Sequence, residues 1–167
     1  MTRARDGIRL DPGEYYFGRG DQRIRTLLGS CVAVTLWHPP SRTGGMCHFL
    51  LPRRPRGPVA AAPDPRYGNE AVALLLRDAV AAGNAPAEHE IKVFGGANVL
   101  PQGAVAHLDV GARNVTAALG MLSGLGLRIH AQHVLGCGHR NIVFDLSCGT
   151  VWVQHTAPAG EATGAGS

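Results

Sequence analysis

Two short apolar runs that follow one another closely, residues 32–37 and 46–51, determine much of what this chain can fold into. The first is rich in β-branched residues and lies between a Gly-Ser pair and two prolines, which is typical of a buried strand. The second ends at Pro52, and the polar Ser-Arg-Thr-Gly segment between the runs has the composition of a turn. We therefore expect a β-hairpin, with Cys31 at the entry to its first strand and His48 inside its second.

Other short runs of the same kind predict further strands. The expected strands cover residues 15–18, 24–28, 90–94, 127–132, 141–146 and 150–154. Apolar residues at helical spacing predict one helix between an N-cap at Asn69 and a terminal glycine at Gly83, and a second helix over residues 113–123. Since strands and helices do not alternate in a βαβ rhythm, we expect an α+β fold, a layered α/β sandwich of β-sheet with two main helices.

The length of 167 residues corresponds to one domain, and we expect a single domain over residues 1–156 followed by a flexible C-terminal tail over residues 157–167. Hydrophobic residues make up 45% of the chain and charged residues 17%, which excludes a disordered chain and a coiled coil. Residues 1–13 are polar, so we expect them to be loosely held. Five prolines in residues 52–65 predict an exposed loop.

The charge of the chain argues against binding to nucleic acid. Its 16 basic and 12 acidic residues give a net charge of +4, which is too small an excess to indicate a basic face, and only 5% of the residues are aromatic. No apolar run approaches the roughly 18 residues of a membrane-spanning helix. The N-terminus lacks the apolar core of an export signal. We therefore expect a cytoplasmic protein that is not inserted in a membrane, with its four cysteines reduced.

The segment Leu28-Gly29-Ser30-Cys31 is the sharpest local feature of the chain. Small neighbours leave the Cys31 thiol accessible, and a corner at Gly29 and Ser30 can turn backbone N–H groups toward one point, as an oxyanion hole requires. Cys31 is therefore a candidate nucleophile, and it would need a nearby base for activation. The alternative is a small buried hydrophobic residue at the start of a strand.

Two further residues are candidates for assisting this cysteine. His48 in the predicted hairpin is the candidate base, although a histidine in an apolar strand is more often a hydrogen-bonded core residue. Thr26 shortly precedes the cysteine, and its hydroxyl could orient His48 or a substrate amide. Its position in an alternating strand, taken alone, indicates an ordinary strand threonine.

The sequence gives no indication of a metal or an organic cofactor. Its eight histidines and four cysteines form neither a Cys-x-x-Cys nor a His-Glu-x-x-His pattern, and its glycine pairs lack the spacing of phosphate-binding loops. Arg53, Arg54 and Arg56 form an exposed basic loop just after the candidate base. That loop is either simply solvated or a contact for an acidic protein surface.

Five segments along the chain occur together, in the same order, in one known family. They are Thr26-Leu-Leu-Gly-Ser-Cys-Val-Ala-Val34, Gly44-Gly-Met-Cys-His-Phe-Leu-Leu-Pro52, Lys92-Val-Phe-Gly-Gly-Ala97, Gly111-Ala-Arg-Asn114 and Gly149-Thr-Val-Trp-Val153. Over residues 10–153 the chain thereby resembles the CheD family, the chemoreceptor glutamine deamidases of bacterial and archaeal chemotaxis.

The resemblance implies that Cys31 is the nucleophile and His48 the base, with assistance from Thr26. It implies hydrolysis of specific glutamine side chains to glutamate, through a cysteine thioester and without a cofactor. The implied substrates are the cytoplasmic helices of methyl-accepting chemoreceptors, so the implied location is the chemoreceptor array. It also implies a fold similar to the catalytic domains of deamidating toxins. The alternative is a non-catalytic or weakly catalytic regulator that binds a CheC-type phosphatase.

Three residues depart from the usual pattern of the family. Cys47 stands where the family usually has asparagine, which we expect to alter the polarity around His48. In the segment before Arg140, His133 replaces a usual aspartate and Leu135 a usual glycine. We expect these departures to affect rate and partner preference and to leave the chemistry intact.

Overall fold

The computed structural model describes residues 7–58, 62–99 and 109–158, which form two β-sheets and a layer of helices. The strands are β1 (Ile8–Arg9), β2 (Tyr15–Arg19), β3 (Arg23–Leu28), β4 (Val32–His38), β5 (Thr43–Phe49), β6 (Glu90–Gly95), β7 (Ile129–Val134), β8 (His139–Asp145) and β9 (Val151–Thr156). The helices are α1 (Gly68–Ala81), α2 (Val110–Gly124) and a short 3₁₀ helix, η1 (Pro86–Glu88). The six strands predicted outside the hairpin are all present, with ends within two residues of those expected.

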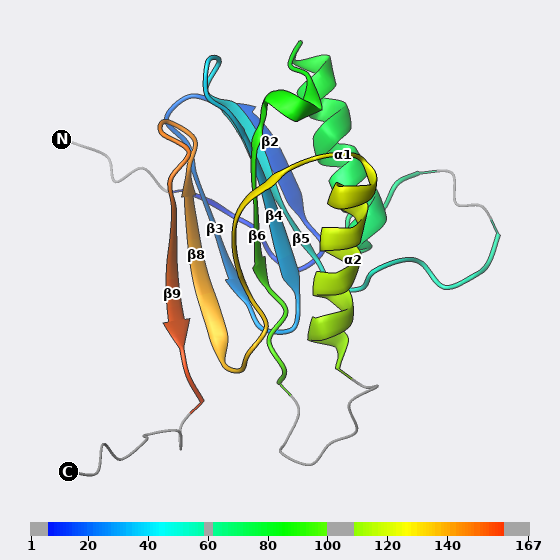
Figure 1. Ribbon diagram of the computed structural model, residues 1–167. Helices are drawn as coiled ribbons and strands as arrows, with labels where there is room; N and C mark the ends of the chain where they lie inside the picture. Colours follow the sequence, from blue (N-terminus) through cyan, green and yellow to red (C-terminus); the bar gives the residue numbers. More distant parts are fainter. Residues whose placement is uncertain (1–6, 59–61, 100–108, 159–167) are drawn as a thin grey trace, which may run out of the picture.

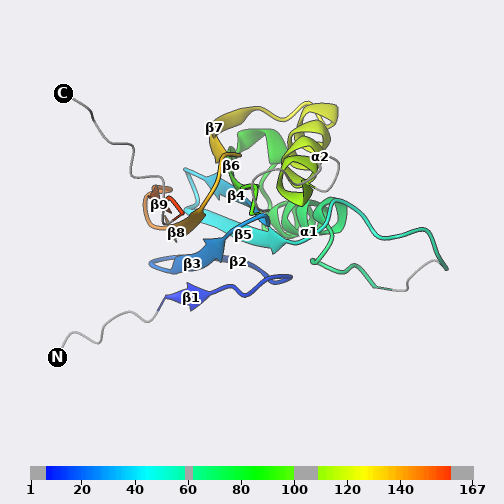
Figure 2. The same cartoon turned by 90° about the horizontal axis from the view of Figure 1, so that it is seen from below.

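The layers are stacked in the order smaller sheet, larger sheet and helices, as Figure 2 shows. Four strands form one sheet in the order β1-β3-β8-β9, and five form the other in the order β2-β5-β4-β6-β7. Both sheets are mixed, because β1 pairs with β3 and β6 with β7 in parallel while the other neighbours are antiparallel. The helices α1 and α2 cover the outer face of the larger sheet (Figure 1). The expected layered α+β fold is confirmed.

The predicted hairpin is the centre of the larger sheet. Its strands β4 and β5 pair in antiparallel fashion, with Ala33 opposite His48 and Val32 opposite Phe49. Nearly every residue of both strands is buried, because the helices cover one face and the smaller sheet covers the other. Val32 and Phe49 belong to the core beneath the helices, whereas Ala33 lies in the core between the sheets. The hairpin is confirmed, although its second strand starts at Thr43, earlier than expected.

The start of α1 is satisfied by the backbone and not by the predicted cap. Tyr67 occupies the N-cap position and makes no side-chain cap hydrogen bond. The N–H groups of Gly68 and Asn69 instead donate to the carbonyl oxygens of Leu51 and Pro52, at 2.8 and 3.2 Å. The prediction of an Asn69 cap is therefore wrong, because the chain leaving β5 supplies the acceptors that a helix start requires.

The start of α2 lies at Val110, before the predicted residue 113, because Asp109 caps the helix. The carboxylate of Asp109 accepts a hydrogen bond of 3.0 Å from the Ala112 N–H. A glycine in the first turn weakens the helical pattern, and this concealed the true start.

At the end of α1, Gly83 follows the C-cap with a φ of 88°, in agreement with its predicted role.

The N-terminal segment is more ordered than its polar composition suggested. Strand β1 pairs with β3, and the Leu10 N–H continues this pairing by donating to the Arg25 carbonyl at 2.8 Å. Leu10 is 5% exposed, and Ile8 packs against the same core between the sheets. The expectation that residues 1–13 are loosely held is therefore wrong for this part, because apolar side chains at every second position anchor it. Residues 1–6 and most of the expected tail lie outside the described residues.

Candidate active site

The turn between β3 and β4, which presents Cys31, packs against the segment that follows β6 at the lower end of the sheets in Figure 1. The Gly96 N–H donates to the Cys31 carbonyl at 2.9 Å, and the Ala97 N–H donates to the Gly29 carbonyl at 3.0 Å. Gly95 has a φ of 104°, and a Cβ atom there would lie 2.3 Å from the Cys31 carbonyl oxygen. Only glycine therefore permits this approach, which fixes the backbone of the turn.

His48 lies on the same face of the hairpin as Cys31. It is opposite Ala33 in the register of β4 and β5, and Cys31 precedes Ala33 by two residues, so Cys31 and His48 are diagonal neighbours. Diagonal neighbours have Cα atoms roughly 7–8 Å apart, within reach of long side chains. His48 is 1% exposed, while Cys31 is partly exposed and packs against the core between the sheets. The structure thus brings the predicted nucleophile and base to one face of one hairpin.

Thr26 reaches His48 from the other sheet and determines which ring nitrogen carries the proton. Its hydroxyl oxygen lies 2.6 Å from His48 Nδ1 and 2.9 Å from the carbonyl oxygen of Leu10. A carbonyl can only accept, so the Thr26 hydroxyl donates to Leu10, and His48 Nδ1–H then donates to the Thr26 oxygen. This chain of hydrogen bonds leaves His48 Nε2 unprotonated, with a lone pair. Nε2 is buried and has no hydrogen-bond partner among the described residues.

Burial keeps both members of the pair neutral in the resting protein. It lowers the pKa of His48 from 6.5 to about 4, against a smaller opposing effect of the Asp11 and Glu14 carboxylates. Burial also raises the pKa of the Cys31 thiol. At neutral pH the site therefore holds a thiol and a neutral imidazole, so that the histidine is prepared to act as a general base on the thiol proton.

The backbone beside the thiol has donors that are not used within the fold. Among residues 7–58, 62–99 and 109–158, neither the Ser30 nor the Cys31 N–H donates a hydrogen bond. The carbonyls of this turn are engaged, since that of Gly29 accepts from Ala97 and that of Ser30 accepts from the Asn114 side chain at 3.1 Å. The turn thus offers donors rather than acceptors next to the thiol, as an oxyanion site requires.

Asn114 is a buried polar residue at this site to which the sequence analysis assigned no role. It is 0% exposed, and its Nδ2 donates to the Ser30 carbonyl and, at 2.8 Å, to the Leu50 carbonyl. The signal was present in the pattern of α2, since Asn114 stands at the helical spacing of the buried residues Gly111 and Ala118. An asparagine at such a core position requires buried partners. The carbonyl of Leu10 was missed as well, because a backbone acceptor leaves no trace in a sequence.

The three arginines of the basic loop do not behave alike. Arg54 binds Glu70 with two hydrogen bonds of 2.7 and 2.9 Å and also donates to the Ala62 carbonyl, so it serves to hold the loop onto α1. Arg53 and Arg56 are exposed. Arg53 lines a small cavity of about 120 Å³ together with Arg113 from the first turns of α2. This cavity lies where the strand that carries His48, the candidate base, leaves the sheet.

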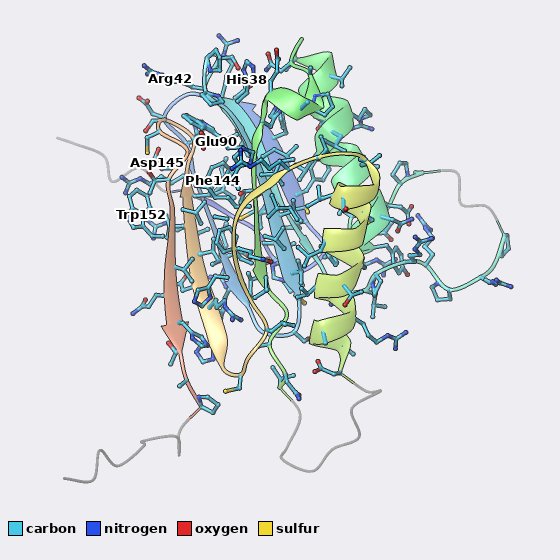
Figure 3. The ribbon with its side chains drawn as sticks, in the orientation of Figure 1. His38, Arg42, Glu90, Phe144, Asp145 and Trp152 are labelled. Atoms are coloured by element: carbon cyan, nitrogen blue, oxygen red, sulfur yellow. The ribbon has the colours of Figure 1, made fainter. Side chains whose placement is uncertain are left out.

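The opposite end of the sheets holds a second polar cluster, part of which is labelled in Figure 3. There Arg23 donates to the Asp145 carboxylate at 2.9 Å, and its guanidinium lies 5.4 Å from the centre of the Trp152 ring. His38 Nδ1 lies 2.6 Å from the Ser41 hydroxyl. These groups form hydrogen bonds and a ring contact with one another, and they lie at the end of the sheets away from the candidate site.

Comparison with known proteins identifies the family. The sequence model described as "CheD chemotactic sensory transduction" matches residues 50–155. A protein of Dechloromonas aromatica named "Probable chemoreceptor glutamine deamidase CheD 3" is 46% identical over 144 residues, covering 86% of this chain and 84% of that protein. A protein of Pseudomonas syringae pv. tomato named "Probable chemoreceptor glutamine deamidase CheD" is 47% identical over 150 residues, covering 89% and 88%. The chain belongs to the CheD family.

A third CheD relative, from Albidiferax ferrireducens, is named "Probable chemoreceptor glutamine deamidase CheD 2" and is 44% identical over 161 residues. Its match covers 94% of this chain and 91% of that protein, so the likeness includes both sheets and both helices. The resemblance inferred from the five sequence segments is therefore confirmed.

The departures from the usual CheD pattern lie away from the hydrogen bonds of His48. Cys47 belongs to the core beneath the helices, on the face of β5 opposite to His48, and burial raises its pKa to about 12. The expectation that Cys47 alters the polarity around His48 is therefore wrong, because successive residues of a strand face opposite sides. His133 Nδ1 accepts a hydrogen bond of 2.7 Å from Arg140 Nε, and Leu135 adopts a left-handed φ of 66°.

Within the described residues, no three His, Cys, Asp or Glu side chains are grouped so that they could hold a metal ion. The same part of the chain contains no helix with the length and apolar character needed to cross a bilayer.

Proposed function

We propose that this protein hydrolyses the side-chain amides of specific glutamines on chemoreceptors to glutamate, as the names of its CheD relatives state for those proteins. One observation carries the proposal. The hydrogen-bond chain from His48 through Thr26 to Leu10 leaves Nε2 of His48 as an unprotonated base on the face that also holds Cys31. A thiol beside a fixed neutral imidazole is the arrangement for nucleophilic attack on an amide.

The first half of the reaction forms a thioester. His48 Nε2 takes the proton of the Cys31 thiol while the sulfur attacks the amide carbon of the glutamine. The N–H groups of Ser30 and Cys31 hold the resulting oxyanion. When the tetrahedral intermediate collapses, the carbon–nitrogen bond breaks, and Nε2 returns its proton to the departing nitrogen, which leaves as ammonia.

The second half of the reaction regenerates the thiol. A water molecule enters where ammonia left, His48 takes one of its protons, and the hydroxide attacks the thioester carbon. The carbon–sulfur bond then breaks, the Cys31 sulfur recovers its proton, and the side chain leaves as glutamate. Throughout, Thr26 keeps the imidazole oriented and accepts the Nδ1 hydrogen bond, which strengthens when the ring is positively charged. No step requires a metal or an organic cofactor.

We propose that the receptor contact includes Arg53 and Arg56. Both are exposed and follow the strand that carries the base, and Arg53 shares a cavity with Arg113. Exposed arginines around a site favour an acidic partner surface through faster association more than through affinity. We leave Arg54 out of this proposal, because its Nε and one of its terminal nitrogens already donate to Glu70. A protein acting on receptor helices in this way would be located at the receptor arrays in the cytoplasm.

The test is incubation of the purified protein with receptor cytoplasmic domains, followed by measurement of released ammonia and by peptide mass spectrometry. We expect individual glutamines to become glutamates with the wild type, and not with Cys31→Ala or His48→Gln. Cys148→Ala is the matched control, because Cys148 is an exposed cysteine remote from the turn of Cys31. Full activity of Cys31→Ala would refute the mechanism. No activity of the wild type on several receptors would refute the function and favour a regulator of a CheC-type phosphatase.

A further inference from the structure

We infer that Asn114 is a positioning residue of this site, whose side-chain amide holds the turn of Cys31 and the strand of His48 at a fixed separation. Its two N–H bonds go to one carbonyl on each of the two chains that carry the catalytic pair. The Ser30 carbonyl immediately precedes Cys31, and the Leu50 carbonyl follows His48 by two residues.

The hairpin needs such a link because its own pairing ends too early. The register of β4 and β5 ends at the pair Val32–Phe49. Cys31 and Leu50 lie one residue beyond that pair, where the two chains diverge into the β3–β4 turn and the proline-rich loop. The Asn114 amide donates to both chains at this point, so it continues the connection between them by one step. Without it, the hydrogen-bonded connection between the two chains would stop at the pair Val32–Phe49, one residue before the thiol.

The packing of α2 places Asn114 between the turn of Cys31 and the chain that follows β5. Gly111 stands one turn earlier, and a Cβ atom on it would lie 2.5 Å from the Gly96 carbonyl oxygen and 2.4 Å from that of Ala97. The absence of a side chain lets the helix rest directly on the backbone whose Gly96 N–H donates to the Cys31 carbonyl. The helix thus contacts the turn of Cys31 twice, through the segment after β6 and through Asn114.

The contacts of Asn114 favour a positioning role over simple satisfaction of a polar core residue. Both Nδ2 protons are used, while Oδ1 is buried and has no hydrogen-bond partner among the described residues. An apolar side chain at this position would remove that unpaired acceptor, but it would take the donor away from the carbonyls of Ser30 and Leu50. What the asparagine provides is two donors in a plane, aimed at the two catalytic segments.

The decisive variant is Asn114→Asp, which preserves the shape and replaces both donors with a carboxylate facing two carbonyls. A misplacement of reacting groups by about 1 Å lowers the rate about 10²-fold, and we expect a loss of this order in kcat with KM little changed. Asn114→Ser is a milder second variant, since its hydroxyl donates one hydrogen bond and reaches one carbonyl at most. Leu122→Ala is the matched control, because it truncates a buried core residue of the same helix about two turns after Asn114, further from the turn of Cys31. It should lower the melting temperature and leave kcat unchanged.

A pH profile separates positioning from stability. The carboxyl introduced by Asn114→Asp regains an O–H donor when it is protonated, and burial raises its pKa. The ratio of its kcat to that of the wild type should therefore rise as the pH falls from 8 toward 5.5, whereas the ratio for Asn114→Ser should stay constant. A purely structural defect would give two parallel profiles.

Because this role presupposes the deamidase activity proposed above, a second measurement does not depend on that activity. The rate of alkylation of Cys31 by iodoacetamide can be measured by mass spectrometry of the peptide that contains Cys31. This rate reports how well His48 accepts the proton of the thiol. We expect slower alkylation in both Asn114 variants than in the wild type and in Leu122→Ala. Failure of the wild type to deamidate receptors would refute the function alone. Asn114 variants with wild-type kcat and alkylation rate, or an equal loss in Leu122→Ala, would overturn the role of Asn114.

Discussion

Acidification should destabilise this protein more than it destabilises a variant that lacks the imidazole of His48. Burial holds the pKa of His48 at about 4 in the folded protein, against 6.5 in the unfolded chain. As the pH falls below 6.5, the unfolded chain therefore takes up a proton that the folded protein does not. The stability linked to neutral His48 is fully present above pH 6.5 and is lost progressively as the pH falls toward 4.

The size of this effect follows from the two pKa values. Each unit of difference corresponds to about 1.4 kcal/mol, so the complete loss is about 3 kcal/mol, of which about 2 kcal/mol is lost between pH 7 and pH 5. The comparison is with His48→Gln, whose side chain has a similar length and can donate to the Thr26 oxygen but does not titrate.

Urea unfolding at pH 7, 6 and 5 measures the difference. Other groups with shifted pKa values, such as the buried His89, are present in both proteins and cancel. The free energy of unfolding of the wild type should fall by about 2 kcal/mol more than that of His48→Gln over this range. Parallel curves for the two proteins would show that His48 is not held neutral by burial. A steeper fall in the variant would refute the reasoning about its environment.

Three further predictions test other parts of the site. Thr26→Val removes the acceptor of His48 Nδ1–H and leaves a buried donor unpaired, which should lower the unfolding free energy by about 1–3 kcal/mol and reduce kcat by one to two orders of magnitude. Gly95→Ala should lower stability by about 1–3 kcal/mol in thermal unfolding, since its φ is 104°, whereas the exposed Gly57→Ala should have no such effect. At pH 7.5 iodoacetamide should modify Cys148 before Cys31, because a hydrogen bond with Thr150 lowers the pKa of the exposed Cys148 while burial raises that of Cys31. Faster modification of Cys31 would indicate a resting thiolate.

The parts of the fold that the sequence predicted are those set by local pattern. The hairpin of β4 and β5 follows from two adjacent β-branched and apolar runs, and its register places Cys31 and His48 on one face without information from elsewhere in the chain. Strand alternation would also have placed Cys47 on the other face. We expected an effect of Cys47 on His48 because the two residues are adjacent in sequence. In a β-strand, however, the side chains of adjacent residues point to opposite faces of the sheet.

The parts that the sequence did not predict depend on contacts between distant segments. Thr26 has the burial pattern of an ordinary strand threonine, and its role arises only because β3 in the smaller sheet faces β5 in the larger one. Asn114 and the carbonyls of Ser30 and Leu50 are separated by 84 and 64 residues along the chain. The prediction of an N-cap at Asn69 was wrong for the same reason. The carbonyls of Leu51 and Pro52, which lie outside the helix, accept the hydrogen bonds of its first N–H groups.

Under the proposed mechanism, the position of the site between two sheets accounts for a cysteine that stays a neutral thiol until substrate binds. A thiolate and an imidazolium would both be unfavourable in this buried setting, so the resting pair is neutral. In the proposed reaction charge develops only when the thiol attacks, and at that moment the N–H groups of the Cys31 turn would hold the oxyanion while Thr26 would stabilise the charged ring. If Cys31 and His48 act as proposed, the same burial that makes His48 a weak base in the absence of substrate would restrict thiolate formation to an amide that fits the site.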